Sequence, residues 1–214
     1  MTALAEKLMP KNWSSQLRFF IIIAVSVIFF DQVSKYQAVA HLTRAFEIPT
    51  GTAELGFVEK VDIFLTLRHP VRAEAVSVVD NFWHFRYVEN PGAAWGFLSG
   101  AASWFRTPFF LIVSLAAMAF IIVYYRRTTP EQRYLRLALA LVLGGAIGNF
   151  LDRVRLSYVI DFIDWHWYDK ATWPTFNVAD SAITVGVTIM VLDMLLAGKA
   201  APKEKTTAKA KGST

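Results

Sequence analysis

Two aspartates in the C-terminal part of the chain carry the clearest chemical signal. Asp161 lies in the stretch VIDFID, and Asp180 ends the stretch FNVAD, directly before an apolar run. Two carboxyl groups held close together and partly out of water cannot both ionise cheaply, so the pair keeps one proton. The ionised member can take a proton from water while the protonated member donates to a carbonyl oxygen. The two residues therefore predict aspartic-peptidase chemistry, provided that the fold brings them together.

Further polar side chains are expected at the same depth, delivered by separate segments. Asp31 and Lys35 are four residues apart, so on a helix they share a face and can pair. Asn90 comes before the apolar segment 107–125. Asn149, Asp152 and Arg153 lie at the end of the segment 137–151, and Asn177 comes before the segment 182–196. This convergence is the main functional signal.

Each of these elements also has a plain structural interpretation, which the residues alone leave open. Asp31 with Lys35, and Asp152 with Arg153, can be ion pairs that make helix ends tolerable in a membrane. Asp180 can be only an N-cap, a position that Asp often takes. Asp164 and Asp193 are interpreted as solvated or interfacial acids.

Composition excludes several classes of chemistry. Cysteine is absent, so thiol catalysis, disulfides and cysteine-based zinc sites are excluded. The four histidines are scattered, without H-E-x-x-H spacing, and no G-x-S-x-G or S-x-x-K motif occurs. We therefore expect no metal and no cofactor.

The elements that must position these residues are four apolar segments. Hydrophobic residues make up 55% of the 214 residues, and aromatic residues, which gather at bilayer interfaces, are abundant. The segments are 19–40, 107–125, 137–151 and 182–196. A spanning helix needs about 20 mostly apolar residues, so three of the four must admit polar residues, which in membranes mark function. Basic residues precede the first segment, as in a signal peptide, but no A-x-A cleavage site follows it closely. We therefore expect a retained helix rather than a signal peptide.

Lysines and arginines predict the orientation of these helices. They gather at the N-terminus, between the second and third segments, and in the tail, and these three regions lie on one side of a four-helix topology. The positive-inside rule puts that side, with both termini, in the cytoplasm. The net charge of +5 is thus a topology signal and does not predict nucleic-acid binding.

The long outer connection is predicted to form a small β-sheet on the membrane surface. In VEKVDIFLTLRH, residues 61, 63, 65 and 67 are apolar and their neighbours mostly polar, which predicts a strand. NFWHFRYVEN is aromatic and ends at a Pro-Gly turn, which predicts a second strand with Trp83, Phe85 and Tyr87 on one face.

Five motifs occur in order along this frame. They are DQVSK, NPGAAWGF, GGAIGNFLDRV, VIDF and FNVADSAI. Together they resemble the motif set of the lipoprotein signal peptidases, also called signal peptidase II or prolipoprotein signal peptidase, over residues 19–196. The resemblance implies an aspartic endopeptidase of the bacterial inner membrane, which cleaves signal peptides from prolipoproteins just before a diacylglyceryl-modified cysteine. It also implies an active site near the periplasmic face and a multi-pass topology.

Roles carry over from the family by motif. The resemblance implies that Asp161 and Asp180 are catalytic, that Asn90, Asn149, Arg153 and Asn177 line the substrate site, and that a further group supports that site structurally: Asp31, Lys35, Gly145 and Asp152. The expected partners are the lipid-modified prolipoprotein and membrane lipids, with the chain acting as a monomer and without nucleic acid.

The expected organisation has three parts. Residues 1–18 form a cytoplasmic N-terminus, residues 19–196 the four-helix membrane domain with a periplasmic β insertion at about 42–103, and residues 197–214 a disordered lysine/alanine-rich tail. An insertion at about 49–79 is longer than the family pattern and is expected to supply an extra strand.

Two other classes of function could use some of these residues. Intramembrane acids can form a proton or ion relay in a small transporter, but a transporter is expected to spread polar groups along a path, often with internal repeats. Here the groups cluster at one depth and no repeat is visible. A non-catalytic membrane assembly protein does not explain two acids on separate segments beside Asn149 and Asn177.

Overall fold

Four long helices and a small antiparallel sheet form the structure, a computed structural model that describes residues 13–47, 55–92, 97–98, 100–168 and 170–200. The helices are α2 (Trp13–Leu42), α4 (Ser103–Arg127), α5 (Arg133–Leu156) and α6 (Val178–Ala200). Each is long and apolar enough to cross a membrane. The four predicted helices are confirmed, each extending several residues past its apolar core. Residues 93–96 of the NPGAAWGF motif and most of the terminal segments lie outside the described residues.

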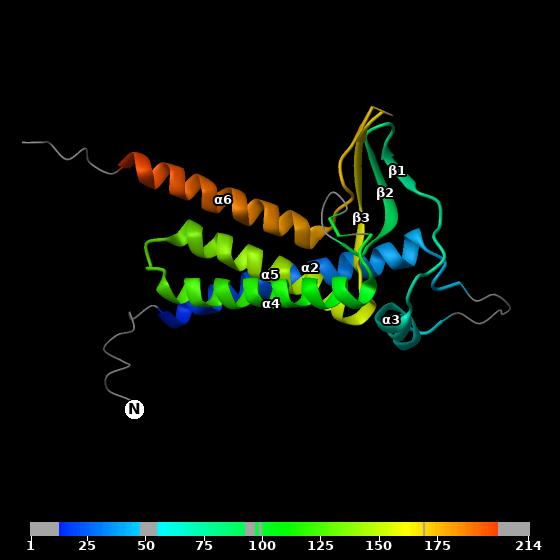
Figure 1. The fold of residues 1–214 in the computed structure, drawn as a ribbon, viewed down its shortest axis with the longest axis horizontal. Helices are drawn as coiled ribbons and strands as arrows, with labels where there is room; N and C mark the ends of the chain where they lie inside the picture. The colour runs from blue at the N-terminus through cyan, green and yellow to red at the C-terminus, as the bar shows by residue number, and fades with distance from the viewer. Residues whose placement is uncertain (1–12, 48–54, 93–96, 99, 169, 201–214) are drawn as a thin grey trace, which may run out of the picture.

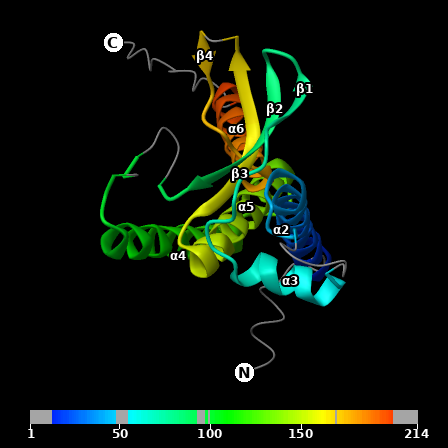
Figure 2. The same cartoon turned by 90° about the vertical axis from the view of Figure 1, so that its right-hand side faces the viewer.

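Helix α5 is the central helix of the bundle. Within its most apolar window 56% of the residues are buried, against 11–17% in the other three helices. It packs against α2, α4 and α6 (Figures 1 and 2). Its inner residues share a core with Phe20 of α2 and with Ile121 and Tyr125 of α4. The apolar outer faces of α2, α4 and α6 are therefore left for lipid, whereas α5 can carry polar residues into the bundle.

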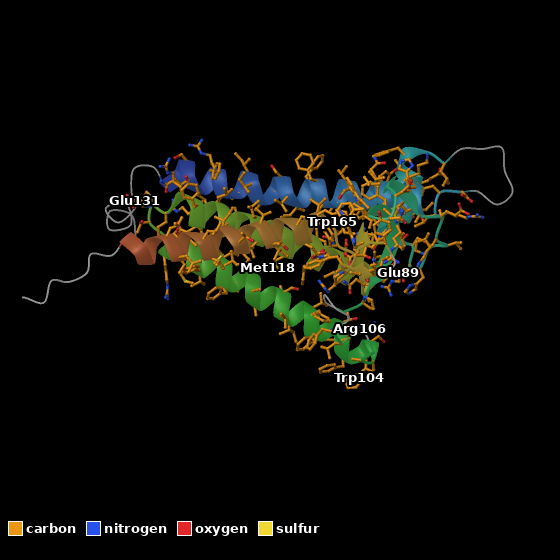
Figure 3. All side chains as sticks on the ribbon, turned by 90° about the horizontal axis from the view of Figure 1, so that it is seen from above. Glu89, Trp104, Arg106, Met118, Glu131 and Trp165 are labelled. Atoms are coloured by element: carbon orange, nitrogen blue, oxygen red, sulfur yellow. The ribbon has the colours of Figure 1, made fainter. Side chains whose placement is uncertain are left out.

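The sheet stands at one end of the bundle. Its strands are β1 (Val76–Val79), β2 (Trp83–Asn90), β3 (Val159–Trp167) and β4 (Ala171–Thr172), in the order β1-β2-β3-β4 and all antiparallel. Figure 1 shows the sheet and α3 at one end, whereas the α4–α5 turn, the start of α2 and the end of α6 lie at the other. In Figure 3, Glu89 and Trp165 accordingly lie far from Glu131. The predicted β2 strand is confirmed.

A second core joins the sheet to the bundle. It contains Val39 and Leu42 of α2, Leu156 of α5, and Ile160 and Phe162 of β3. Tyr87 is buried in this core, Phe85 packs against it, and the Trp83 ring contacts the Phe85 ring at 5.3 Å. The β2–β3 register shifts between Phe85 and Val88, so one extra β2 residue is accommodated there.

The predicted strand at residues 61–67 is wrong. Residues Phe57–Thr66 form a helix, α3. The backbone N–H of Gly56 donates to the Glu59 carboxylate at 2.8 Å and thereby caps the helix start. Phe64, the exception to the period-two pattern, is the buried residue, and the Arg155 guanidinium of α5 lies 4.4 Å from its ring centroid. The extra strand that the insertion supplies is β1 instead.

Candidate active site

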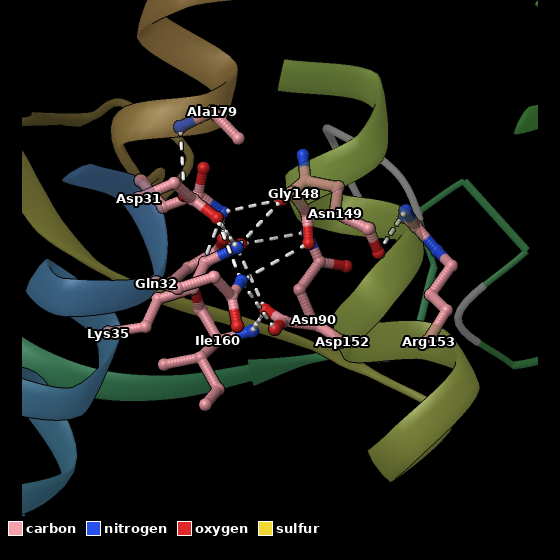
Figure 4. Close-up of polar contacts among 12 residues, drawn as sticks. Asp31, Gln32, Lys35, Asn90, Gly148, Asn149, Asp152, Arg153, Ile160 and Ala179 are labelled. Atoms are coloured by element: carbon pink, nitrogen blue, oxygen red, sulfur yellow. Dashed lines mark hydrogen bonds and ion pairs between the residues drawn. The ribbon is translucent and has the colours of Figure 1, made fainter. Parts of the chain in front are cut away.

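A fully buried charge cluster joins α2 to α5 below the sheet. The Nζ atom of Lys35 lies 2.9 Å from Asp31 Oδ2, 2.8 Å from Asp152 Oδ2 and 3.0 Å from Asn149 Oδ1 (Figure 4). These three acceptors match the three donors of an ammonium group. Asp31, Lys35 and Asp152 are completely inaccessible to solvent. Arg155 adds a second cation, with Nη2 2.8 Å from Asp152 Oδ1. Two carboxylates and two cations therefore balance in charge.

The same two carboxylates hold backbone groups next to Asp161 and Asp180. Asp31 Oδ1 accepts the N–H of Ala179 at 3.0 Å, in the first turn of α6. Asp152 Oδ2 accepts the N–H of Ile160 at 3.2 Å, in β3. Ala179 directly precedes Asp180, and Ile160 directly precedes Asp161. The cluster thus fixes both segments that carry the aspartates and is more than the simple ion pair weighed for Asp31 and Lys35.

Main-chain pairing brings these two segments side by side. Phe176, just before α6, forms a bridge with Ile163 of β3, donating to its carbonyl at 3.0 Å and accepting its N–H at 2.9 Å. Asn177 is the N-cap of α6, since its Oδ1 accepts the N–H of Asp180 at 2.9 Å. Asp180 Oδ2 accepts the Asn177 N–H at 3.3 Å in return, which completes a capping box. The N-cap role considered for Asp180 therefore belongs to Asn177.

Amide groups donate to every oxygen of the two carboxyl groups. Asn177 Nδ2 lies 2.7 Å from Asp161 Oδ1, and Asn90 Nδ2 lies 2.9 Å from Asp161 Oδ2. Asn149 Nδ2 lies 2.7 Å from Asp180 Oδ1, and the backbone N–H of Asn177 donates to Asp180 Oδ2. Neither aspartate forms an ion pair with a described residue. The pair is therefore held by neutral donors.

Burial governs the protonation of this pair. Asp161 is 1% exposed. Loss of hydration raises the pKa of the Asp161 carboxyl above its usual range, and the neighbouring charge of Asp180 raises it further, while the amide donors of Asn90 and Asn177 oppose the rise. The desolvated carboxyl group of Asp161 therefore favours its protonated form.

A pocket of about 510 Å³ opens beside Asp180, whereas Asp161, which is 1% exposed, is not among its lining residues. Asn90, Asn149, Arg153 and Asp180 line one part of it. The rest is formed by the end of β3, by the segment between β3 and α6, and by α6, mainly through apolar and aromatic side chains: Trp165, Trp173, Pro174, Phe176, Ile183 and Val185. Asn177 is fully buried and is not among the lining residues, so it lies behind the carboxyl pair and holds Asp161 in place.

Arg153 faces this pocket with spare donor capacity. Its Nη2 donates to the Gly92 carbonyl at 3.0 Å, and its guanidinium lies 5.0 Å from the Phe110 ring centroid. Its Nε atom is buried and has no hydrogen-bond partner among the described residues. A buried donor without a partner costs free energy, so this atom is suited to a bound polar group.

Two glycines let the helices approach closely enough to build the cluster. A Cβ atom on Gly145 would lie 2.4 Å from the Ala179 carbonyl oxygen of α6. A Cβ atom on Gly148 would lie 2.6 Å from Asp31 Oδ2. Small residues at membrane helix contacts permit this kind of backbone approach. Gly145 therefore lies directly against the backbone of α6, where a side chain would clash.

Several residues of this region were not identified from the sequence. Gln32 donates to Asp31 and Asp152 at 3.1 and 3.2 Å, and Arg155 neutralises Asp152. The prediction of Asp164 as a solvated or interfacial acid is wrong, because it is 6% exposed and pairs with Arg86. Asp193 is only partly buried. Strand pairing also brings His84, Asp164 and His166 together, which their spacing along the chain did not indicate.

Comparison with known proteins places the chain in a family. The family model described as signal peptidase (SPase) II matches residues 23–196. The chain belongs to the signal peptidase II family. Its members are membrane-embedded proteases that remove signal peptides, so this chain is a bacterial membrane protease of that kind.

Individual relatives agree with this family assignment. The chain is 49% identical over 193 residues to the lipoprotein signal peptidase of Anaeromyxobacter sp., covering 88% of this chain and 90% of the relative. It is 51% identical over 119 residues to that of Syntrophotalea carbinolica, covering 56% of this chain and 72% of the relative. A bacterial membrane enzyme solved at 2.3 Å resolution superposes with a TM-score of 0.62 at 29% identity, over 87% of this chain and 93% of that one.

Proposed function

We propose that Asp161 and Asp180 are the catalytic pair of an aspartic endopeptidase. The observation that carries the proposal is the environment of the pair beside the pocket. Both carboxyl groups are held by neutral amide donors alone among the described residues, whereas the carboxylates of the neighbouring cluster are neutralised by cations. Their hydrogen-bond donors are neutral, and loss of hydration at Asp161 favours retention of the single proton that acid–base hydrolysis requires.

The reaction needs only this proton and one water molecule. The ionised carboxylate takes a proton from water as the oxygen attacks the scissile carbonyl carbon, and the protonated carboxyl group donates its proton to the carbonyl oxygen. In the tetrahedral diol that results, the first carboxyl group passes its new proton to the amide nitrogen and the C–N bond breaks. The second recovers a proton from the diol hydroxyl, and the pair again holds one proton. The two pKa values belong to the pair, so neither aspartate is assigned as the permanent base.

The pocket suits a lipid-modified peptide. Asn90, Asn149 and Arg153 offer polar contacts next to Asp180, and the apolar residues of α6 extend the pocket away from them. We assign the first group to the peptide backbone or to lipid-adjacent polar groups, and the apolar part to acyl chains. The relatives are named lipoprotein signal peptidases, and the proposed bond is therefore the one before a diacylglyceryl-modified cysteine.

The charge distribution supports a site near the periplasmic face. Arg126, Arg127 and Arg133 lie at the end of the bundle opposite the sheet and the carboxyl pair (Figure 1). The positive-inside rule assigns that end, and with it both termini, to the cytoplasm of the bacterial inner membrane. A signal peptide that spans the membrane then meets the pair near its outer end. The gathering of polar groups at one end of the bundle also argues against a transport path. We further propose that the protein acts as a monomer.

A gel-shift assay in detergent tests the proposal. Purified wild-type protein and the Asp180→Asn variant are mixed with a diacylglyceryl-modified prolipoprotein and with the same precursor lacking the lipid. The matched control is Asp193→Asn, which changes an acid near the other end of the same helix. Cleavage of only the lipidated precursor, by wild type and Asp193→Asn but not by Asp180→Asn, is the expected result. Equal cleavage by Asp180→Asn removes this residue from the catalytic pair.

A further inference from the structure

Three metal-ligating side chains meet on the outer sheet, away from the carboxyl pair. His84 of β2 stands directly opposite Asp164 of β3, and His166 lies two residues further along β3 on the same face. One ligand atom from each of the three lies within 4.8 Å of the other two. The two imidazole rings are 4.5 Å apart between centroids, and His166 Nδ1 is 3.6 Å from Asp164 Oδ2. These side chains are preassembled by strand pairing.

We propose that His84, Asp164 and His166 form a binding site for Zn²⁺. Two imidazoles and one carboxylate are ligands that zinc accepts, and three protein ligands leave a fourth tetrahedral position for water. Ligand atoms around tetrahedral zinc are roughly 3.4 Å apart, given metal–ligand bonds of about 2.0–2.1 Å. The three atoms lie within 4.8 Å of one another, so zinc binding requires the side chains to close in on the ion.

The carboxylate is already held in place for this role. Arg86 donates to both oxygens of Asp164, with Nε 3.0 Å from Oδ2 and Nη2 3.0 Å from Oδ1. A carboxylate offers about four acceptor positions, so two remain for the metal. Metal-ligating carboxylates are commonly oriented by such hydrogen bonds. The Arg86 side chain is half exposed, so water screens the repulsion between its charge and the metal.

The site would stabilise the part of the sheet that lies next to the pocket. Zinc would cross-link β2 to β3, because its ligands come from both strands. Arg86 also donates to Thr175 Oγ1 at 3.3 Å, and Thr175 and Trp165 line the pocket. The metal therefore stabilises the outer wall of the pocket and takes no part in the hydrolysis proposed for Asp161 and Asp180.

Calorimetric titration with ZnCl₂ tests this site independently of peptidase activity. The full chain is purified in detergent with an affinity tag that contains no histidine, stripped with EDTA and exchanged into chelator-free buffer. Wild type is compared with His84→Ala and His166→Ala, and with His41→Ala, which changes a histidine outside the cluster, on α2. Gel filtration checks that each variant is folded, and the visible spectrum of Co²⁺ as a substitute ion reports its coordination.

The expected result is one zinc per chain for wild type and His41→Ala, with affinity lowered by more than about tenfold in both cluster variants. Zinc should also raise the melting temperature of wild type and not of His84→Ala. Absence of saturable binding by wild type overturns the proposal, as does unchanged binding by folded His84→Ala or His166→Ala. If an alanine variant does not fold, His84→Asn is measured in its place. The wild-type titration decides by itself whether the protein has a saturable zinc site.

Discussion

Two pairs of aspartates in this protein have contrasting surroundings. Asp31 and Asp152 surround the ammonium of Lys35, and Arg155 supplies a second positive charge. Asp161 and Asp180 are contacted by the amides of asparagines and by one backbone N–H. The first pair has a counter-charge for each carboxylate, and the second has no ion pair with any described residue.

The difference separates a supporting role from a chemical one. Counter-charges compensate the buried carboxylates of the first pair, and the remaining lone pairs of these carboxylates hold the backbone at Ala179 and Ile160. Asp161 and Asp180 have neutral hydrogen-bond donors, which suits the singly protonated state that we propose for acid–base hydrolysis. Under this proposal, the first pair stabilises the geometry in which the second reacts.

The largest expected effect is on catalysis, from removing either member of the uncompensated pair. Asp161→Asn and Asp180→Asn should each lower the cleavage rate by about 10⁴-fold or more, because neither variant can complete the proton cycle. The double variant should be no worse than the single ones, since the two residues act as a unit. Rates of lipoprotein precursor cleavage in micelles measure this. Independent, additive losses would contradict a shared proton.

The next largest effect is on stability, from removing the counter-charge of the other pair. Lys35→Met should cost about 3–5 kcal/mol, because it leaves two buried carboxylates without their ammonium. Lys60→Met on α3, which is outside the cluster, is the control. Thermal unfolding in detergent measures the difference. A melting temperature equal to that of the control would show that the cluster is not needed for folding.

Asn177 contacts both members of the reactive pair, and two substitutions separate its roles. Asn177→Ser keeps a side-chain oxygen that can cap α6 but removes the amide that holds Asp161. We expect near wild-type stability with activity lowered by about tenfold, whereas Asn177→Ala should also lose about 1 kcal/mol of stability through the cap. Unfolding and cleavage rates measured on both variants test this. Full activity of a folded Asn177→Ser variant would show that the Asn177 amide is not needed for cleavage.

The pH dependence of cleavage reports the shared proton. Burial and the charge of Asp180 raise the pKa of Asp161, so the proton is retained at neutral pH and is lost only as pH rises through this raised value. Activity should therefore fall at low pH, when both groups are protonated, and fall again on an alkaline limb above the ordinary aspartate range. A kcat/KM profile measures both limbs. Activity that rises through pH 4 and then shows no alkaline limb before the protein unfolds would be inconsistent with this assignment.

The smallest effects are expected at two acids that lie outside both pairs, Asp164 and Asp193. Asp164→Asn and Asp193→Asn should each keep cleavage within about twofold of wild type, as for changes away from reacting groups. Only Asp164→Asn should lower stability, by about 1 kcal/mol, because it weakens the pairing with Arg86. Parallel unfolding and activity measurements on the two variants check this. A large loss of activity in Asp193→Asn would extend the site to the far end of α6.

The sequence predicted the four helices and strand β2 of the outer sheet, and it named the residues of both pairs. It did not predict β3, the strand that carries Asp161. Apolar length alone was sufficient for the helices, and the spacing of Asp31 and Lys35 indicated a shared face. It did not predict how the pairs are built. The bridge between Phe176 and Ile163, which brings Asp161 and Asp180 together, depends on contacts that no local pattern encodes.

The errors have physical causes. Residues 57–66 alternate almost as a strand does, yet the Glu59 cap and the burial of Phe64 against Arg155 stabilise a helix. Asp164 has no nearby basic residue in the sequence, and its partner Arg86 comes from another strand. His84 and His166 are likewise brought together only by the β2–β3 register. Cross-strand contacts were thus the main information missing from the sequence.

Infrared absorption of protonated carboxyl groups tests the contrast between the two pairs most directly. Spectra of the purified protein at neutral pH are compared with those of Asp161→Asn, Asp180→Asn and, as a control for the charge-balanced cluster, Asp152→Asn. We predict a protonated-carboxyl band in the wild-type protein that persists in folded Asp152→Asn and disappears in either variant of the reactive pair. A wild-type spectrum without that band, or a band that disappears only in Asp152→Asn, would contradict the account.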